Sequence, residues 1–185
     1  MDATIEGFLL QLLGIDQDLP GLVAGLSPAQ FNWAPAPGRW SIGQCIEHLN
    51  ITTERYLPGL QRAMADARAA GKLGHGPFTL GFVERWFMQV LEPPVRRRVK
   101  TPKAFVPTLA LAPDATLRRW QDLQGQFAQS IRAAEGLDLR AVRVRSQFAP
   151  VSFSLNGTLG ILLAHERRHL WQAREVRKDR AFPAS

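Results

Sequence analysis

The stretch SIGQCIEHLNITTERYLPGLQRAM, residues 41–64, predicts a long amphipathic helix. It begins with Ser41, followed three residues later by Gln44, which is the S-x-x-Q pattern of a capping box at a helix N-terminus. Glycines at positions 71, 74 and 76 mark the end of the pattern. Between these signals, apolar residues recur at helical spacing, at Ile42, Cys45, Ile46, Leu49, Tyr56, Leu60 and Met64.

Similar apolar spacing predicts more helices on both sides of this stretch. Pro20 is expected to interrupt or kink the first of them, and Asn156 or Thr158 is expected to cap the last. A shorter helix is expected before Pro93. The predicted helices lie at about residues 4–26, 114–135 and 157–177, with the shorter one inside residues 79–92.

The segments between these helices are rich in proline and glycine. Residues 27–40 form a connector, and residues 93–113 form a long crossover that we expect to have little regular structure. No alternating strand pattern of any length and no internal repeat occurs. The sequence therefore predicts an all-α fold, a four-helix bundle with a long crossover loop and one short extra helix.

Length and composition indicate one globular domain, residues 1–185. The chain is 21% charged and 45% hydrophobic, as in ordinary soluble proteins. No apolar run approaches the ~20 residues that cross a bilayer, and the first residues lack the basic start of a signal peptide. A single cysteine, Cys45, offers no intrachain disulfide. We expect a cytoplasmic protein that does not associate with membranes.

The net charge of +7 is concentrated in two segments, residues 96–103 and 139–146. Both have poor helical periodicity, and no nucleic-acid-binding motif accompanies them. Nucleic-acid binding would therefore rest on net charge alone. We interpret both segments as solvated basic loops and expect no nucleic-acid partner.

Histidines on two predicted helices suggest a metal site. His165 and His169 lie four residues apart, so their side chains are about 40° and one turn from each other on one helix face. His48 lies at the edge of the apolar face of the helix that begins near Ser41, and can add a third imidazole. Such a site leaves coordination positions for water or substrate. Alternatively, each histidine is a hydrogen-bonded core or surface residue.

The segment HERRHLWQ, residues 165–172, also matches the H-E-x-x-H signature of zinc metalloproteases, in which Glu166 would be the general base. Most such proteases need a third ligand downstream. Here Glu175 lies roughly 120° away from the face of His169, so it cannot easily reach the same ion. The chain also lacks evident strands that would bind an extended peptide. We therefore disfavour a protease.

Several motifs together resemble the DinB-like superfamily, which includes YfiT-like metal-dependent hydrolases and thiol transferases. They are WSIGQ at residues 40–44 with His48-Leu49 after it, KTPKAFVP at residues 100–107, and HERRHLWQ at residues 165–172. The resemblance spans nearly the whole chain. It implies an up-down-down-up four-helix bundle and a divalent metal ion, usually zinc or nickel. The three metal ligands of the family correspond to His48, His165 and His169. Homodimers and low-molecular-weight thiol substrates are also implied.

We therefore expect a metal-dependent enzyme that acts on a small molecule, by thiol S-transfer or hydrolysis. Glu166 is the candidate catalytic residue, as a base or as a hydrogen-bond partner of an imidazole. The basic residues Arg96, Arg97, Arg98 and Lys100 are candidates for binding a carboxylate of a low-molecular-weight thiol. The alternative is a non-catalytic bundle that binds a metal or a stress-related partner. An open metal position favours the enzyme, whereas a fourth protein ligand favours a structural site.

Overall fold

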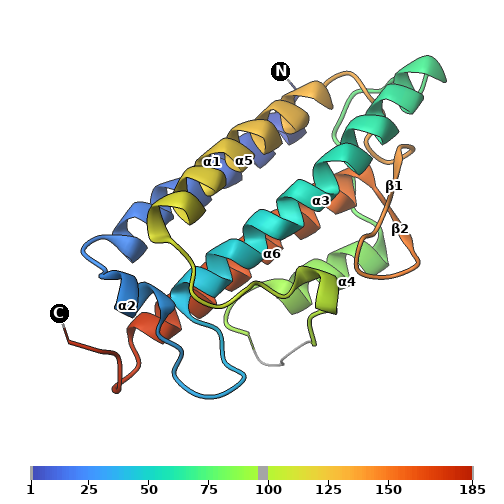
Figure 1. Ribbon diagram of the computed structural model, residues 1–185. Helices are drawn as coiled ribbons and strands as arrows, with labels where there is room; N and C mark the ends of the chain where they lie inside the picture. The colour runs from blue at the N-terminus through green and yellow to red at the C-terminus, as the bar shows by residue number, and fades with distance from the viewer. Residues whose placement is uncertain (1, 96–99, 185) are drawn as a thin grey trace.

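Four long helices form the body of the protein in the computed structural model, which describes residues 2–95 and 100–184 (Figure 1). They are α1 (Ala3–Val23), α3 (Ile42–Ala69), α5 (Pro113–Ala133) and α6 (Leu155–Arg177). Helices α3 and α5 run in one direction, and α1 and α6 run in the other (Figure 1). The two helices of each pair contact each other, and between the pairs α3 contacts α6 and α1 contacts α5. The predicted all-α, up-down-down-up bundle is confirmed.

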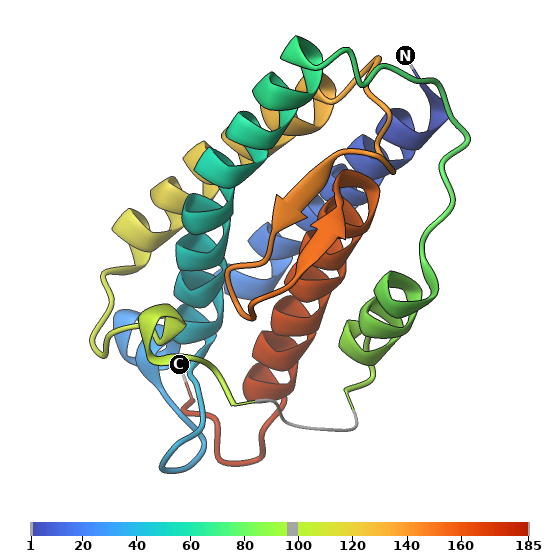
Figure 2. The ribbon, with the colours of Figure 1, turned by 90° about the vertical axis from the view of Figure 1, so that its right-hand side faces the viewer.

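The parallel arrangement of α3 and α5 explains the long crossover between them. Helix α3 has 28 residues, so the chain must return along roughly 40 Å before α5 can start in the same direction. The return includes α4 (Phe82–Leu91), the predicted short helix, which contacts α6. It also includes a 3₁₀ turn, η1 (Lys103–Phe105). In Figure 2 helix α4 and the segment before it lie on the outside of the bundle. Arg96, Arg97 and Arg98 lie outside the described residues, and Lys100 is exposed.

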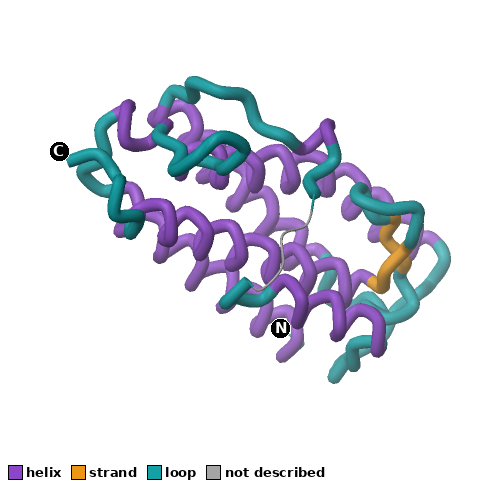
Figure 3. Tube along the Cα trace, turned by 90° about the horizontal axis from the view of Figure 1, so that it is seen from below, coloured by secondary structure: helices purple, strands orange, loops and turns teal. Residues whose placement is uncertain are grey.

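Two predicted loops contain regular structure that the sequence analysis missed. The connector before α3 includes α2 (Pro28–Asn32), whose start has its own capping box between Ser27 and Gln30. The segment before α6 forms a hairpin, in which β1 (Arg143–Arg145) pairs antiparallel with β2 (Ser152–Ser154). Each strand has three residues, too few for an alternating pattern to stand out. Figure 3 shows these loops and the hairpin on the outside of the helical body.

Two expectations about helix ends need correction. Helix α1 continues past Pro20 to Val23 without interruption. Ser154, rather than Asn156 or Thr158, caps α6, because its hydroxyl accepts a hydrogen bond from the backbone N–H of Gly157. The Asn156 amide instead donates to the carbonyl of Phe78, and the Thr158 hydroxyl donates to the carbonyl of Ser154.

A buried carboxylate joins α4 to the start of α6. Glu84 accepts hydrogen bonds from the backbone N–H of Gly81 at 3.0 Å and of Ser154 at 2.6 Å. Burial alone would raise the pKa of Glu84, but these hydrogen bonds outweigh it and lower the pKa below its usual value. A Cβ at Gly157 would lie 2.4 Å from the Glu84 carboxyl carbon, so only glycine allows this approach. The contact fixes the hairpin and the first turn of α6 against α4.

The core fills the space between the four long helices. Its centre includes Trp120, Phe127 and Ile131 of α5, each at most 1% exposed. The indole N–H of Trp120 donates to Asp16 of α1 at 3.0 Å, so this buried ring keeps a polar partner. Among residues 2–95 and 100–184, no helix combines the length and apolar character needed to cross a membrane.

Candidate metal centre

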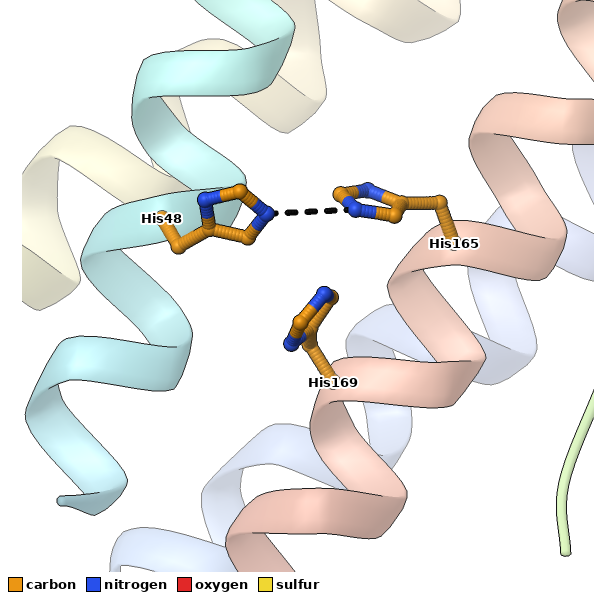
Figure 4. Close-up of side chains that lie close together, drawn as sticks. All are labelled: His48, His165 and His169. Atoms are coloured by element: carbon orange, nitrogen blue, oxygen red, sulfur yellow. Dashed lines mark hydrogen bonds between the residues drawn. The ribbon is translucent and has the colours of Figure 1, made fainter. Parts of the chain in front are cut away.

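Three imidazoles meet between α3 and α6 (Figure 4). His48 comes from α3, and His165 and His169 come from successive turns of α6. One ring nitrogen of each lies within 4.8 Å of the others, and the Nε2 atoms of His48 and His165 are 3.2 Å apart. His75 is exposed in the loop after α3 and takes no part. The structure thus brings together the three histidines that the sequence singled out.

A backbone carbonyl orients the His48 ring. Nδ1 of His48 lies 2.8 Å from the carbonyl oxygen of Phe105, in the η1 turn of the crossover. Because a carbonyl only accepts, Nδ1 carries the proton, and Nε2 directs its lone pair toward the other two histidines. A hydrogen bond of this kind, behind a metal-binding imidazole, orients the ring and fixes its tautomer.

Burial keeps the three imidazoles neutral. It lowers the pKa of His48 to about 4, although the hydrogen bond to Phe105 acts in the opposite direction. It lowers the pKa values of His165 and His169 well below the usual value, and the neighbouring charge of Arg168 adds to this. Neutral imidazoles are the form that binds metal ions.

The cluster contains buried polar atoms that the protein leaves unsatisfied. Nδ1 of His165 and Nδ1 of His169 are buried without a hydrogen-bond partner in the described part of the chain. Unpaired buried polar groups are costly, and they concentrate at sites with a ligand or a reaction. An all-nitrogen donor set suits zinc, nickel, copper and iron. The residues present therefore fit a divalent metal ion.

No fourth protein ligand joins the cluster within residues 2–95 and 100–184. The cluster of histidine, cysteine or acidic side chains there consists of His48, His165 and His169 alone. An ion bound by three protein ligands keeps coordination positions for water or substrate, as in catalytic sites. Cys45, three residues before His48, is fully buried in the core, and burial raises the pKa of its thiol. It therefore behaves as a small apolar residue, as expected.

The carboxyl group of Glu166 makes its hydrogen bond with α5 and not with the histidine cluster. Its Oε1 accepts a hydrogen bond of 3.0 Å from the Gln124 amide of α5, and Thr53 of α3 is a further neighbour. Burial raises the pKa of Glu166 to about 8, and the hydrogen bond from Gln124 only partly offsets this. The side chain is therefore a neutral acid at pH 7. A catalytic role for Glu166 stays a prediction.

Aromatic rings from three connecting segments surround the histidines. The Trp40 ring lies 4.8 Å from the His48 ring and 5.6 Å from the His169 ring, centre to centre. Phe148, in the turn of the hairpin, lies 5.7 Å from His165 and 4.3 Å from Phe105. No sequence pattern had singled out Phe105 or Phe148 as a neighbour of the histidines.

Comparisons with known proteins agree with this fold. A family model described as the DinB superfamily matches residues 11–173. YfiT from Bacillus subtilis, described as "a probable metal-dependent hydrolase with an unusual four-helix bundle topology", has a similar structure with a TM-score of 0.61. It is 13% identical, and the alignment covers 94% of this chain and 86% of YfiT. No curated protein sequence matches the chain. Because the family match covers most of its length, the chain belongs to the DinB superfamily.

Proposed function

We propose that the protein is a metal-dependent enzyme that binds a divalent ion through His48, His165 and His169. The observation that carries this proposal is the meeting of three buried, neutral imidazoles within 4.8 Å, with no fourth ligand in the described part of the chain. Zinc or nickel is the ion we propose, as the family resemblance implies. A bound ion would lower the pKa of a coordinated thiol or water, so that a nucleophile forms near neutral pH.

We propose a small molecule as the substrate, with a low-molecular-weight thiol as the first choice and a hydrolysable ester or amide as the second. The histidines are at most 9% exposed and lie against the Trp40 and Phe148 rings, which suits a small ligand better than an extended peptide. The description of YfiT as a metal-dependent hydrolase supports metal chemistry in this family. Transfer of the thiol sulfur rests on the family resemblance alone.

The protein's own part in this reaction is to position the reactants. Phe105 holds the His48 ring through its carbonyl, and α6 places His165 and His169 one turn apart. Such positioning can supply a large share of a rate enhancement without any further acid or base. Glu166, if it acts, would do so as a proton donor at neutral pH, because its raised pKa keeps it protonated.

Metal content tests the ion-binding half of the proposal. Untagged full-length protein is analysed by elemental mass spectrometry, beside His169→Ala and beside His75→Ala as a matched control with an exposed histidine. We expect about one ion per chain in the wild type and in the control, and loss of the ion in His169→Ala. Absence of metal in all three proteins, after incubation with zinc and with nickel, would overturn the proposal.

Turnover tests the catalytic half. The metal-loaded protein is assayed with thiols plus an electrophile such as an alkyl halide or an epoxide, and separately with ester and amide substrates. Activity that disappears in His169→Ala and is unchanged in His75→Ala supports the enzyme. Stoichiometric metal without turnover on any of these substrates would favour the alternative, a non-catalytic metal-binding or stress-related interaction protein.

A further inference from the structure

Two aromatic rings, those of Trp40 and Phe148, contact the histidine cluster, and a third, that of Phe105, contacts Phe148; all three come from segments outside the four long helices. Trp40 ends the connector before α3, Phe105 lies in the η1 turn of the crossover, and Phe148 lies between the two hairpin strands. We call these three residues the aromatic cage. Phe148 also contacts Phe105, with ring centres 4.3 Å apart, so two of the rings form a continuous surface beside the histidines.

Separate contacts hold each ring of the cage in place. The Phe105 carbonyl is tied to Nδ1 of His48, and the Arg55 guanidinium lies over the Phe105 ring, 5.2 Å from its centre. Trp40 directly precedes the capping box at the start of α3. Such anchoring keeps Trp40 and Phe148 beside the cluster, where both also pack against the edge of the bundle core.

The hairpin turn that carries Phe148 has its own attachment to α3. The Tyr56 hydroxyl accepts a hydrogen bond from the backbone N–H of Gln147 at 3.1 Å and pairs with the Ser146 hydroxyl at 3.2 Å. Phe148 itself is half-buried, whereas Gln147 and Ala149 on either side of it are exposed. The ring therefore lies beside His165 at a surface turn.

We propose that the aromatic cage selects substrates with an aromatic or alkyl group next to the atom that binds at the histidines. This inference rests on the proposed function, because it names the substrate class of the same site. A ligand that binds at the histidines on the side of Trp40 or Phe148 lies against their rings. An apolar group then gains contact with them and leaves water, whereas a polar group loses hydration that these rings do not replace.

The test compares three thiols of different character on cobalt-loaded, full-length protein. The probes are 2-mercaptoethanol, which is small and polar, mercaptoacetate, which is anionic, and benzyl mercaptan, which is aromatic. Each is titrated while the absorption spectrum of the cobalt ion is followed, which reports binding without any turnover. We expect benzyl mercaptan to bind at least about tenfold more tightly than 2-mercaptoethanol, through burial of its ring.

Variants at Phe148 separate selectivity from packing. In Phe148→Ala we expect most of the preference for benzyl mercaptan to disappear, with little change for 2-mercaptoethanol, and in Phe148→Leu we expect an intermediate preference. Phe82→Ala is the matched control, because Phe82 is 85% exposed on α4 and should leave all three affinities unchanged. Thermal unfolding of each variant confirms that it is folded.

Three outcomes would overturn the inference. One is an unchanged ratio of the benzyl mercaptan and 2-mercaptoethanol affinities in Phe148→Ala, which would reduce Phe148 to a packing residue. Another is a wild-type preference for mercaptoacetate, which would identify an anionic substrate. Failure of the wild type to bind cobalt would overturn the proposed function as well, and it is recognised before any thiol is added.

Discussion

The Nε2 atoms of His48 and His165 lie 3.2 Å apart, although the residues are 117 positions apart in the sequence. Nδ1 of His48 already donates to the Phe105 carbonyl, so its Nε2 has no proton and must accept from Nε2 of His165. In the metal-free protein, His165 is then protonated on Nε2, which leaves its unpaired Nδ1 as a buried lone pair. An ion bound at the Nε2 atoms of both rings would replace this imidazole pair, and His165 would then carry its proton on Nδ1.

We predict that metal raises the thermal stability of the protein. A ligand that binds only the folded state at a hundred times its Kd stabilises it by about 2.7 kcal/mol, which is on the order of 5–10 °C for a chain of this length. The unfolding midpoint is measured by circular dichroism with excess zinc and with a chelator. His169→Ala should show no difference between the two conditions. An equal shift in that variant would mean that the ion binds elsewhere.

We predict that the metal-free protein loses stability as the pH falls from about 6.5 to about 4. The pKa of His48 is about 4 in the folded state and near 6.5 in the unfolded state. Between these values the unfolded chain binds a proton that the folded chain excludes, so acidification favours unfolding. For His48 alone the effect reaches about 3 kcal/mol by pH 4, and His165 and His169 act in the same direction.

Urea unfolding of the chelator-treated protein at several pH values measures this loss. His48→Gln cannot titrate, so its stability should fall less steeply over the same range. Glu166 titrates in the opposite direction over this range, so the decisive sample is Glu166→Gln, in which a stability that stays constant between pH 6.5 and pH 4.5 would contradict the burial of neutral imidazoles at this site. The metal-bound protein should resist acid further, because the ion competes with protons for the same nitrogens.

For Glu166 we predict the opposite effect of pH on stability, on the alkaline side of neutrality. Its pKa is about 8 in the folded state and near 4.5 in the unfolded state, so between these values only the folded chain holds the proton. Stability should therefore decline as the pH rises from about 6.5 to 8, above the range in which the histidines titrate. Glu166→Gln resembles the neutral acid and should abolish this decline while metal content stays at the wild-type level.

Kinetics of Glu166→Gln then test the catalytic role predicted for Glu166. A proton donor at neutral pH would be lost in the variant, so turnover by the metal-loaded protein should fall, and the alkaline limb of its pH profile should disappear. Unchanged turnover would restrict Glu166 to its buried contact with Gln124. Wild-type and variant metal contents, measured on the same samples, separate this result from loss of the ion.

Local patterns explain which parts of the fold and the site could be predicted. The Ser41–Gln44 capping box and the apolar spacing after it define α3, and the spacing of His165 and His169 places both on one face of α6. The direction of the helices is not a local property, and its prediction depended on the family resemblance. Helix α2 could have been found, because Ser27 and Gln30 repeat the S-x-x-Q pattern that identified α3.

The contacts that orient and surround the histidines had no comparable signal in the sequence. His48 is oriented by the main-chain carbonyl of Phe105, 57 residues away, and any residue type offers such a carbonyl. Phe148 reaches His165 only because a hairpin with strands of three residues turns back toward the cluster. Glu166 follows a predicted ligand, but its contact with Gln124 is a hydrogen bond between α6 and α5, which are distant in the sequence. These features follow from tertiary packing rather than from sequence spacing.

We predict that a methyl group at Gly43 damages the start of α3, which positions Trp40. A Cβ there would lie 2.4 Å from the ring of Phe31, which is 1% exposed and has no room to move. Gly43→Ala should therefore destabilise the protein by about 1–3 kcal/mol, in urea unfolding with the metal removed.

Gly125→Ala is the control, because Gly125 is exposed in the middle of α5 with nothing within 4 Å of its added Cβ. The free energy of unfolding of that variant should rise by about 0.5–1 kcal/mol, because alanine leaves the unfolded backbone less freedom than glycine does. Equal effects of the two substitutions would show that helix propensity, and not contact with Phe31, determines the outcome at Gly43.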